Sequence, residues 1–192
     1  MQRRSFLARL SLASALTWLP VTLAMAHTPY RFWNVFRKRN MQIMTSLEDE
    51  AGDDKGEAWV AVLRDKLPLS RAMVSRAHKM TRTASLLKTD QVKIAVLSYE
   101  HAQQMLSGAA SFAEFVPMQL EILVDDGHHL LVCRTDVPLY HGYLITMALM
   151  EAADSLKLLK PAPARFGMAL HPGALAYYRG DKLEPPPAPA DS

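Results

Sequence analysis

Apolar and polar residues alternate along this chain in a way that predicts several short strands. Lys93 to Leu97 is nearly all apolar, which is typical of a strand that is covered on both faces. Asp125-Asp126-Gly127 is a turn signal of the hairpin type. Further strands are expected at residues 42–45, 118–124 and 129–134.

Apolar residues three and four positions apart predict helices. These helices are expected at residues 57–67, 70–88, 99–107 and 136–158, with a short one that begins at His171-Pro172-Gly173. Ser98 can cap the helix at 99–107, and Gly108 follows it where a left-handed residue ends many helices. Ser46 to Gly56 holds five acids and two glycines and is expected to be a loop. The order of elements predicts a layered domain of the α/β or α+β type, and we expect a single α/β domain with three layers.

The first 26 residues are typical of an export signal. Arg3 and Arg4 form a twin-arginine core, an apolar run covers residues 10–24, and Ala24-Met25-Ala26 supplies a cleavage site. We therefore expect the twin-arginine route, a mature chain that starts at His27, and a periplasmic location. An uncleaved anchor is the alternative, although the run is short for a membrane span and Pro20 interrupts it.

Removing residues 1–26 changes the electrostatic interpretation. Arg3, Arg4 and Arg9 account for the whole formal charge of +3. The mature chain is then neutral, so charge gives no reason to expect a nucleic-acid or membrane partner. The single cysteine, Cys133, excludes an intrachain disulfide. We expect one domain over residues 27–180 and a proline-rich, disordered tail over 181–192.

Three stretches resemble a known family. They are LLKTDQVKIAVL at 86–97, LLVCRTDVP at 130–138 and HPGALAYYRG at 171–180, and the last is the most specific. Together they resemble the periplasmic solute receptors of TRAP transporters, in particular the TAXI group. The resemblance implies the type II periplasmic binding fold, a small carboxylate ligand and a membrane transporter subunit as partner.

The chain also departs from that family. The family usually has two lobes, whereas only residues 108–124 stand in the place of the second lobe. The apolar stripe from Met73 to Leu87 stands where the family has a strand. We therefore expect a single lobe, acting as a reduced receptor that binds a small carboxylate or as an accessory subunit that binds a protein partner.

Candidate binding residues follow from the expected sheet. Ser98, Tyr99 and His101 come directly after the buried strand, and ligands in open α/β sheets gather at such carboxyl ends. Amide groups at the start of the next helix favour an anion there. Ser46 follows the first strand, where the nearby acids would repel a carboxylate unless Lys55 offsets them, and His171 completes the predicted set. Roles as a plain helix cap for Ser98 and a structural turn for His171 stay open.

The alternative class is a periplasmic enzyme or a cofactor- or metal-carrying protein that is exported folded. No Gly-x-Ser-x-Gly elbow, phosphate loop or His-Glu-x-x-His helix is present in the sequence. His128, His129 and Cys133 suit a metal by chemistry. In a strand, however, His129 and Cys133 would lie about 13 Å apart, at roughly 3.3 Å per residue. We therefore expect no catalytic residue, no metal and no cofactor.

Overall fold

A computed structural model describes residues 40–162, 164–165 and 167–184 of the protein. The expected signal segment, with Arg3 and Arg4, lies outside these residues, as does most of the expected tail. No helix in the described ranges has the length and apolarity that crossing a membrane requires.

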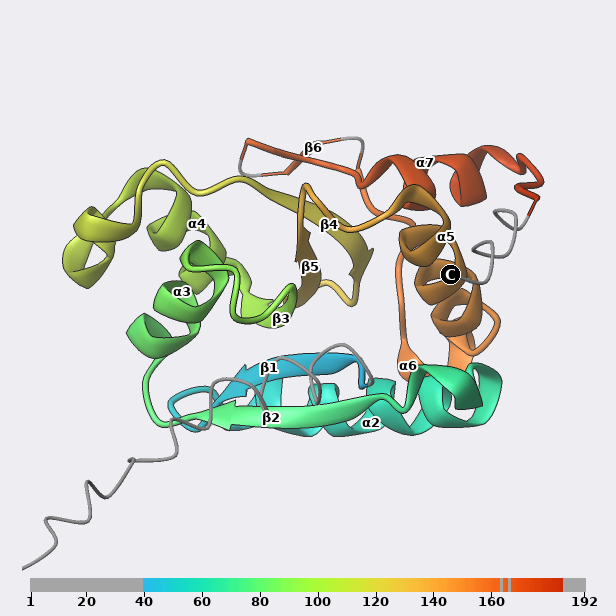
Figure 1. The fold of residues 1–192 in the computed structure, drawn as a ribbon, viewed down its shortest axis with the longest axis horizontal. Coiled ribbons are helices and arrows are strands. Elements are labelled where there is room, and N and C mark those ends of the chain that lie inside the picture. The colour runs from blue at the N-terminus through green and yellow to red at the C-terminus, as the bar shows by residue number, and fades with distance from the viewer. Residues whose placement is uncertain (1–39, 163, 166, 185–192) are drawn as a thin grey trace, which may run out of the picture.

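The described residues form an α/β fold around a mixed sheet of five strands (Figure 1). The strands are β1 (Gln42–Ser46), β2 (Met73–Ala77), β3 (Ile94–Ser98), β4 (Leu120–Asp125) and β5 (His129–Arg134). Their order is β2-β1-β3-β5-β4; β1 is parallel to β2 and β3, and β5 is antiparallel to β3 and β4. The predicted α/β class is confirmed, and this arrangement is compatible with one lobe of a periplasmic-binding-like fold.

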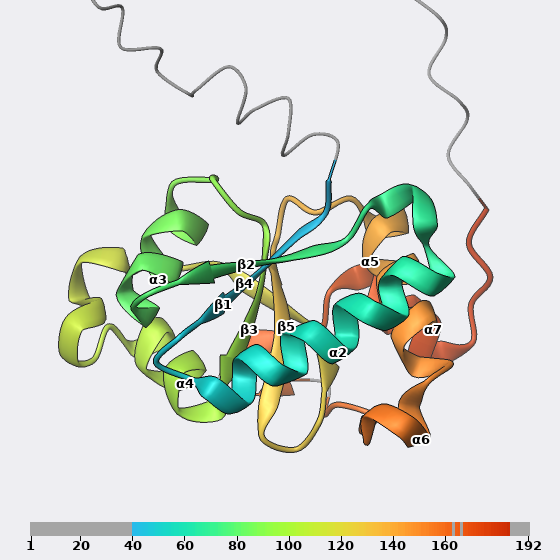
Figure 2. The same cartoon turned by 90° about the horizontal axis from the view of Figure 1, so that it is seen from below.

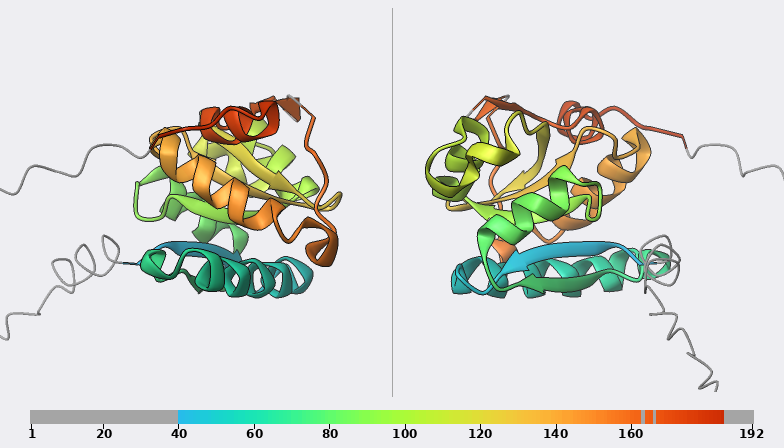
Figure 3. Two further views of the ribbon diagram at one scale, coloured as in Figure 1. Left: turned by 90° about the vertical axis from the view of Figure 1, so that its right-hand side faces the viewer. Right: turned by 60° about the vertical axis from the view of Figure 1, so that its left-hand side comes forward.

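Helices cover both faces of the sheet (Figure 2). They are α2 (Glu50–Lys66), α3 (Met80–Lys88), α4 (Tyr99–Ser107), α5 (Leu139–Met150), α6 (Ala153–Leu156) and α7 (Pro172–Arg179). Short 3-10 turns η1 (Pro68–Ser70) and η2 (Ala110–Phe115) and a small ribbon of β6 (Ala164–Arg165) with β7 (Met168–Ala169) complete the fold. Helices α3 and α4 pack on one face, whereas α2, α5 and α7 pack on the other, where α2 and α5 lie side by side (Figure 3).

The strand predicted at Lys93 to Leu97 is confirmed as β3. Ala95 and Leu97 face the core beneath α3 and α4, whereas Ile94 and Val96 face the core beneath α2 and α5. All four are buried, as expected for a strand covered on both sides. The predicted hairpin between β4 and β5 is also confirmed.

The helix predicted at residues 70–88 is wrong in its first half, where the chain forms β2 and only then α3. Met73 and Ala77 are four positions apart, so they lie on one side of a helix but also on one face of a strand. The pattern could not separate the two, and pairing of β2 with β1 decides for the strand.

The loop predicted at Ser46 to Gly56 is wrong as well, because α2 begins at Glu50. Asp49 caps this helix, and the acids in its first turn suit the positive end of the helix dipole. Gly56 is buried, and a Cβ atom at this position would collide with the methyl group of Thr45 on β1. The glycine therefore reflects close packing of α2 on the sheet. The helix predicted at 136–158 is shorter and divided into α5 and α6.

Candidate functional site

A group of polar side chains, two of them buried and three half-buried, gathers at the carboxyl ends of β1 and β3. Helix α2 follows β1 closely, and α4 follows β3 directly. Ser98, the last residue of β3, pairs with His129, the first residue of β5, so the hairpin reaches the same edge. We call this region the carboxyl edge. It brings together five polar residues: Asp49, Ser98, His101, Asp126 and His129.

Asp49 is the centre of this group, and its side chain is 11% exposed. Its Oδ1 accepts the backbone N–H of Gly52 at 2.9 Å and lies 3.2 Å from Nε2 of His129. Its Oδ2 lies 3.9 Å from Nδ1 of His101. Oδ2 is buried and accepts no hydrogen bond from the described residues. Among the described residues, therefore, no group donates a hydrogen bond to this second carboxylate oxygen.

Ser98, His101 and Asp49 do not form a nucleophilic triad. Ser98 Oγ lies 2.8 Å from Nδ1 of His101, which is the same ring nitrogen that faces Asp49. A catalytic triad requires the hydroxyl and the carboxylate on opposite nitrogens, so that one orients the ring while the other gives up a proton. Ser98 also accepts the backbone N–H of His101 as the cap of α4. Ser98 is therefore a helix cap in this arrangement.

Asp126 holds the β4–β5 hairpin in place at the carboxyl edge. Its Oδ1 accepts the backbone N–H groups of His128 and His129 at 2.9 and 2.6 Å, and its Oδ2 lies 3.0 Å from Nζ of Lys55. Burial alone would raise the pKa of Asp126, but these two N–H groups and the ammonium of Lys55 outweigh burial and lower it. Asp126 is consequently an ionised structural anchor, with Nδ1 of His129 only 4.0 Å away.

Two of the predicted site residues lie near this edge but bond within the protein. The Tyr99 hydroxyl donates to Oδ1 of Asp125 at 2.5 Å, which ties α4 to the hairpin. Ser46 is 1% exposed, and its Oγ accepts the backbone N–H of Glu48. Ser98 is the member of the predicted set that reaches the central group.

The helix starts at this edge already hold acceptors from the chain itself. Asp49 caps α2, and Ser98 caps α4. The Glu48 carboxylate accepts the backbone N–H of Met80, the first residue of α3, at 2.7 Å. A bare anion would therefore meet two carboxylates in the places where amide groups would otherwise attract it. Lys55, which was expected to offset the acids, is paired with Asp126.

His171 lies elsewhere in the fold. It neighbours Cys133, which pairs with Ile94 at the amino end of β3, whereas Ser98 marks the carboxyl end. The ring is 1% exposed, accepts the backbone N–H of Gly173 at Nδ1, and donates from Nε2 to the carbonyl of Val137 at 3.0 Å. The structure thus gives His171 the structural role that the sequence left open and does not bring it to the other predicted residues.

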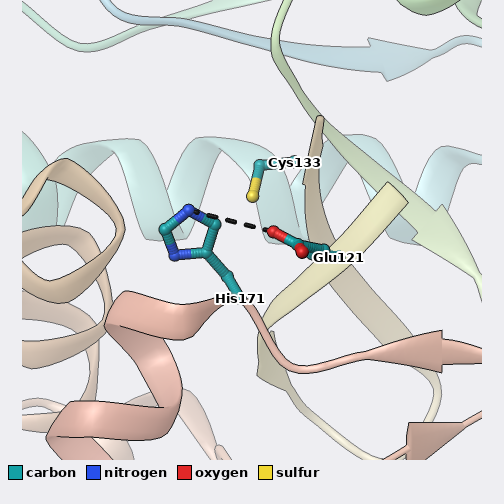
Figure 4. Close-up of side chains that lie close together, drawn as sticks. All are labelled: Glu121, Cys133 and His171. Atoms are coloured by element: carbon teal, nitrogen blue, oxygen red, sulfur yellow. Dashed lines mark ion pairs between the residues drawn. The ribbon is translucent and has the colours of Figure 1, made fainter. Parts of the chain in front are cut away.

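A second group joins Glu121, Cys133 and His171 on the face covered by α5 and α7 (Figure 4). Their potential ligand atoms lie within 4.8 Å of one another, and Glu121 Oε2 is 4.0 Å from Nε2 of His171. A metal bound at Nε2 of His171 would leave the ring proton on Nδ1. Nδ1 could then no longer accept the backbone N–H of Gly173. Burial raises the pKa of the Cys133 thiol, with Glu121 and Asp136 adding to the effect. The group is therefore arranged as a structural contact.

Sequence reasoning missed Asp49, Asp126 and Glu121 as site residues. Asp49 was hidden because residues 46–56 were expected to form a loop, and Asp126 because it belongs to a turn signal. Glu121 carried a signal, since a single acid inside an apolar strand needs a partner.

Comparison of the chain with models of protein families and with curated proteins finds no match.

Proposed function

We propose that this protein is an exported, single-lobe solute-binding protein of the TAXI type, which works in the periplasm by binding rather than by catalysis. Its ligand binds at the carboxyl edge of β1 and β3. The observation that carries this proposal is Asp49, a nearly buried carboxylate between His101 and His129 whose Oδ2 has no donor among the described residues. The mixed sheet and the strand β2, which the family pattern requires after its first helix, also support it.

The chemistry of the carboxyl edge favours a ligand that carries both a carboxylate and an ammonium group, as an amino acid does. The ammonium offers donors to Asp49, which a bare carboxylate does not. Because Oδ2 of Asp49 is buried, this contact requires a neighbouring side chain such as His101 to move aside. The carboxylate of the ligand approaches the imidazole of His101, whose side chain is 24% exposed and lies over Asp49. Such a site in one open lobe leaves much of the ligand in water. We expect affinities of tens of micromolar or weaker, equivalent to about 6 kcal/mol.

A transition metal ion is a second candidate ligand, and a specific observation favours it. Asp49, His101 and His129 offer one carboxylate and two imidazoles, donors that zinc prefers. Their ligand atoms do not all lie within 4.8 Å of one another, so a shared ion requires one of these side chains to move. Asp126 Oδ1 lies 4.0 Å from Nδ1 of His129, which is longer than the hydrogen bond by which an outer carboxylate orients a metal-binding histidine. This candidate belongs to the class of metal-carrying proteins exported in the folded state.

Titration calorimetry on the purified protein tests the proposal, with amino acids, dicarboxylates and zinc as separate ligands. Asp49→Asn keeps the helix cap, because Asn caps helices as well as Asp, but removes the charge. We expect it to weaken binding of an amino acid by about tenfold or more, the loss typical of a charge-assisted hydrogen bond. Asp54→Asn, an exposed change on the same helix, is the matched control and should leave affinity unchanged.

The arms of this experiment separate the two ligands. Amino-acid binding that depends on Asp49 supports the solute-binding proposal. Zinc binding that is lost in His101→Gln but kept in His78→Gln, an exposed histidine after β2, supports the metal. If Asp49→Asn binds the ligands as tightly as the unaltered protein and the control Asp54→Asn do, the proposed site is wrong.

A further inference from the structure

An apolar groove opens at the opposite end of the sheet, where β1 and β3 begin. Its volume is about 810 Å³, within the range of clefts that bind ligands. The end of α2, η1 and the start of α5 form its walls together with the two strands. The apolar lining includes Met41, Leu67, Leu69, Val92, Val137 and Leu144.

This groove lacks cover from the described residues. Leu69 on η1 is 96% exposed, the highest value among the exposed large apolar side chains of the described residues. A contiguous apolar hollow of this size is unusual on a soluble monomer unless something binds in it. The groove is distinct from the carboxyl edge, so an occupant here is independent of the proposed function.

The chain itself enters along the wall of the groove. Asn40 and Met41 line it, and the backbone of Met41 is fixed by hydrogen bonds with Ser70 and Met73, each of 2.9 Å. Phe36 is therefore tethered within about 14 Å of Asn40, at 3.3–3.6 Å per residue. A tether this short gives a segment an effective concentration in the millimolar range at the groove.

The residues just before Asn40 have the composition that such a groove accepts. Residues 30–36 read Tyr-Arg-Phe-Trp-Asn-Val-Phe, with four aromatic side chains in seven positions. Each aromatic side chain can bury 150–250 Å² and dominates the energetics of an apolar contact. This segment lies after the expected cleavage site, so the mature protein keeps it.

We propose that residues 30–36 bind in this groove within the same molecule. The segment would then cover Leu69 and the apolar lining around it. Trp33 lies at the middle of the segment and provides a probe, while Trp59, a fully buried residue of α2, provides an internal reference.

Fluorine NMR on protein labelled with 5-fluorotryptophan tests this proposal. The Trp33 resonance is assigned by its loss in Trp33→Phe, and its exposure is measured by the shift between H₂O and D₂O. We expect Trp33 to be protected nearly as well as Trp59. Leu69→Asp should expose Trp33, because it places a charge in the groove. Leu47→Asp changes another exposed leucine, 51% exposed and near the carboxyl edge, and should have no effect.

Three results would overturn the proposal. Trp33 could be as exposed in the native protein as in urea, which would leave the groove to another occupant. Its protection could disappear on dilution, which would show that the segment binds a second copy of the chain. Its protection could also persist unchanged in Leu69→Asp, which would place the segment elsewhere.

Discussion

The carboxylate of Asp49 at the start of α2 lies 3.2 Å from Nε2 of His129 on β5, and the two residues are 80 positions apart in the sequence. This contact ties the antiparallel hairpin to the parallel part of the sheet. It also holds Asp49 in place while its second oxygen faces His101. The position of Asp49 therefore depends on the whole topology, which is why one change at a distant residue can alter the candidate site.

Asp126 is expected to contribute to stability at neutral pH. Its pKa is lowered in the fold, so its stabilisation is present above about pH 4 and is lost as the pH falls through its folded value. Asp126→Ala removes the acceptor for two backbone N–H groups, of which that of His129 is buried, and should cost about 2 kcal/mol at pH 7. Urea unfolding from neutral to acid pH measures this. The cost should shrink in acid, whereas Asp54→Ala should show little cost at any pH.

Local sequence features were enough to predict some elements of the fold but not others. β3 and the cap at Ser98 were predictable because an unbroken apolar run and a capping serine are local features. Ser46 to Gly56 was mistaken for a loop because its glycines and acids usually indicate one. In the fold, Gly56 packs closely against Thr45, a contact that depends on tertiary structure.

The candidate site was predictable only in part. Ser98 and His101 could be placed at the end of a buried strand, because ligands gather there in α/β sheets. The approach of His129 to Asp49 could not be predicted, since it depends on the register between β3 and β5. The same limit applied to His171, whose neighbours Glu121 and Val137 lie far away in the sequence.

Glu121 is expected to make stability fall as the pH rises. Burial raises the pKa of Glu121, with the nearby His171 opposing this effect. The folded protein therefore keeps the proton over a pH window, above about pH 4.5, in which the unfolded chain has released it. Glu121→Gln cannot ionise and should be more stable than the unaltered protein by about 1 kcal/mol at neutral pH, with no gain in acid.

Urea unfolding as a function of pH measures this difference, and Glu114→Gln, at an exposed position, is the control. Identical pH profiles for Glu121→Gln and the unaltered protein would show that the carboxyl group is not desolvated.

Gly142 on α5 should tolerate no side chain while His171 is present. A methyl group at this position would collide with the imidazole ring. Gly142→Ala should therefore destabilise the protein by about 1–3 kcal/mol through overpacking. In a double-mutant cycle with His171→Ala, thermal or urea unfolding should show that the combined cost is smaller than the sum of the separate costs. Additive costs would mean that the two positions are not in contact.

Export is expected to require Arg3 and Arg4. Replacing both by lysine keeps the charge but loses the two guanidinium groups, which lysine does not reproduce. The mature protein should then be missing from the periplasmic fraction, and mass spectrometry of the unaltered protein should find His27 at the N-terminus. Normal export of the lysine variant would argue against the twin-arginine route.

The most direct test of the binding account is amide chemical-shift mapping by NMR during a titration with L-glutamate, an amino acid with a carboxylate side chain. The account predicts shifts concentrated at Gly52, His101, Gly127 and His129, all at the carboxyl edge, and their loss in Asp49→Asn. Shifts that concentrate instead at Leu69 and Val92 in the groove, or that persist unchanged in Asp49→Asn, would contradict it.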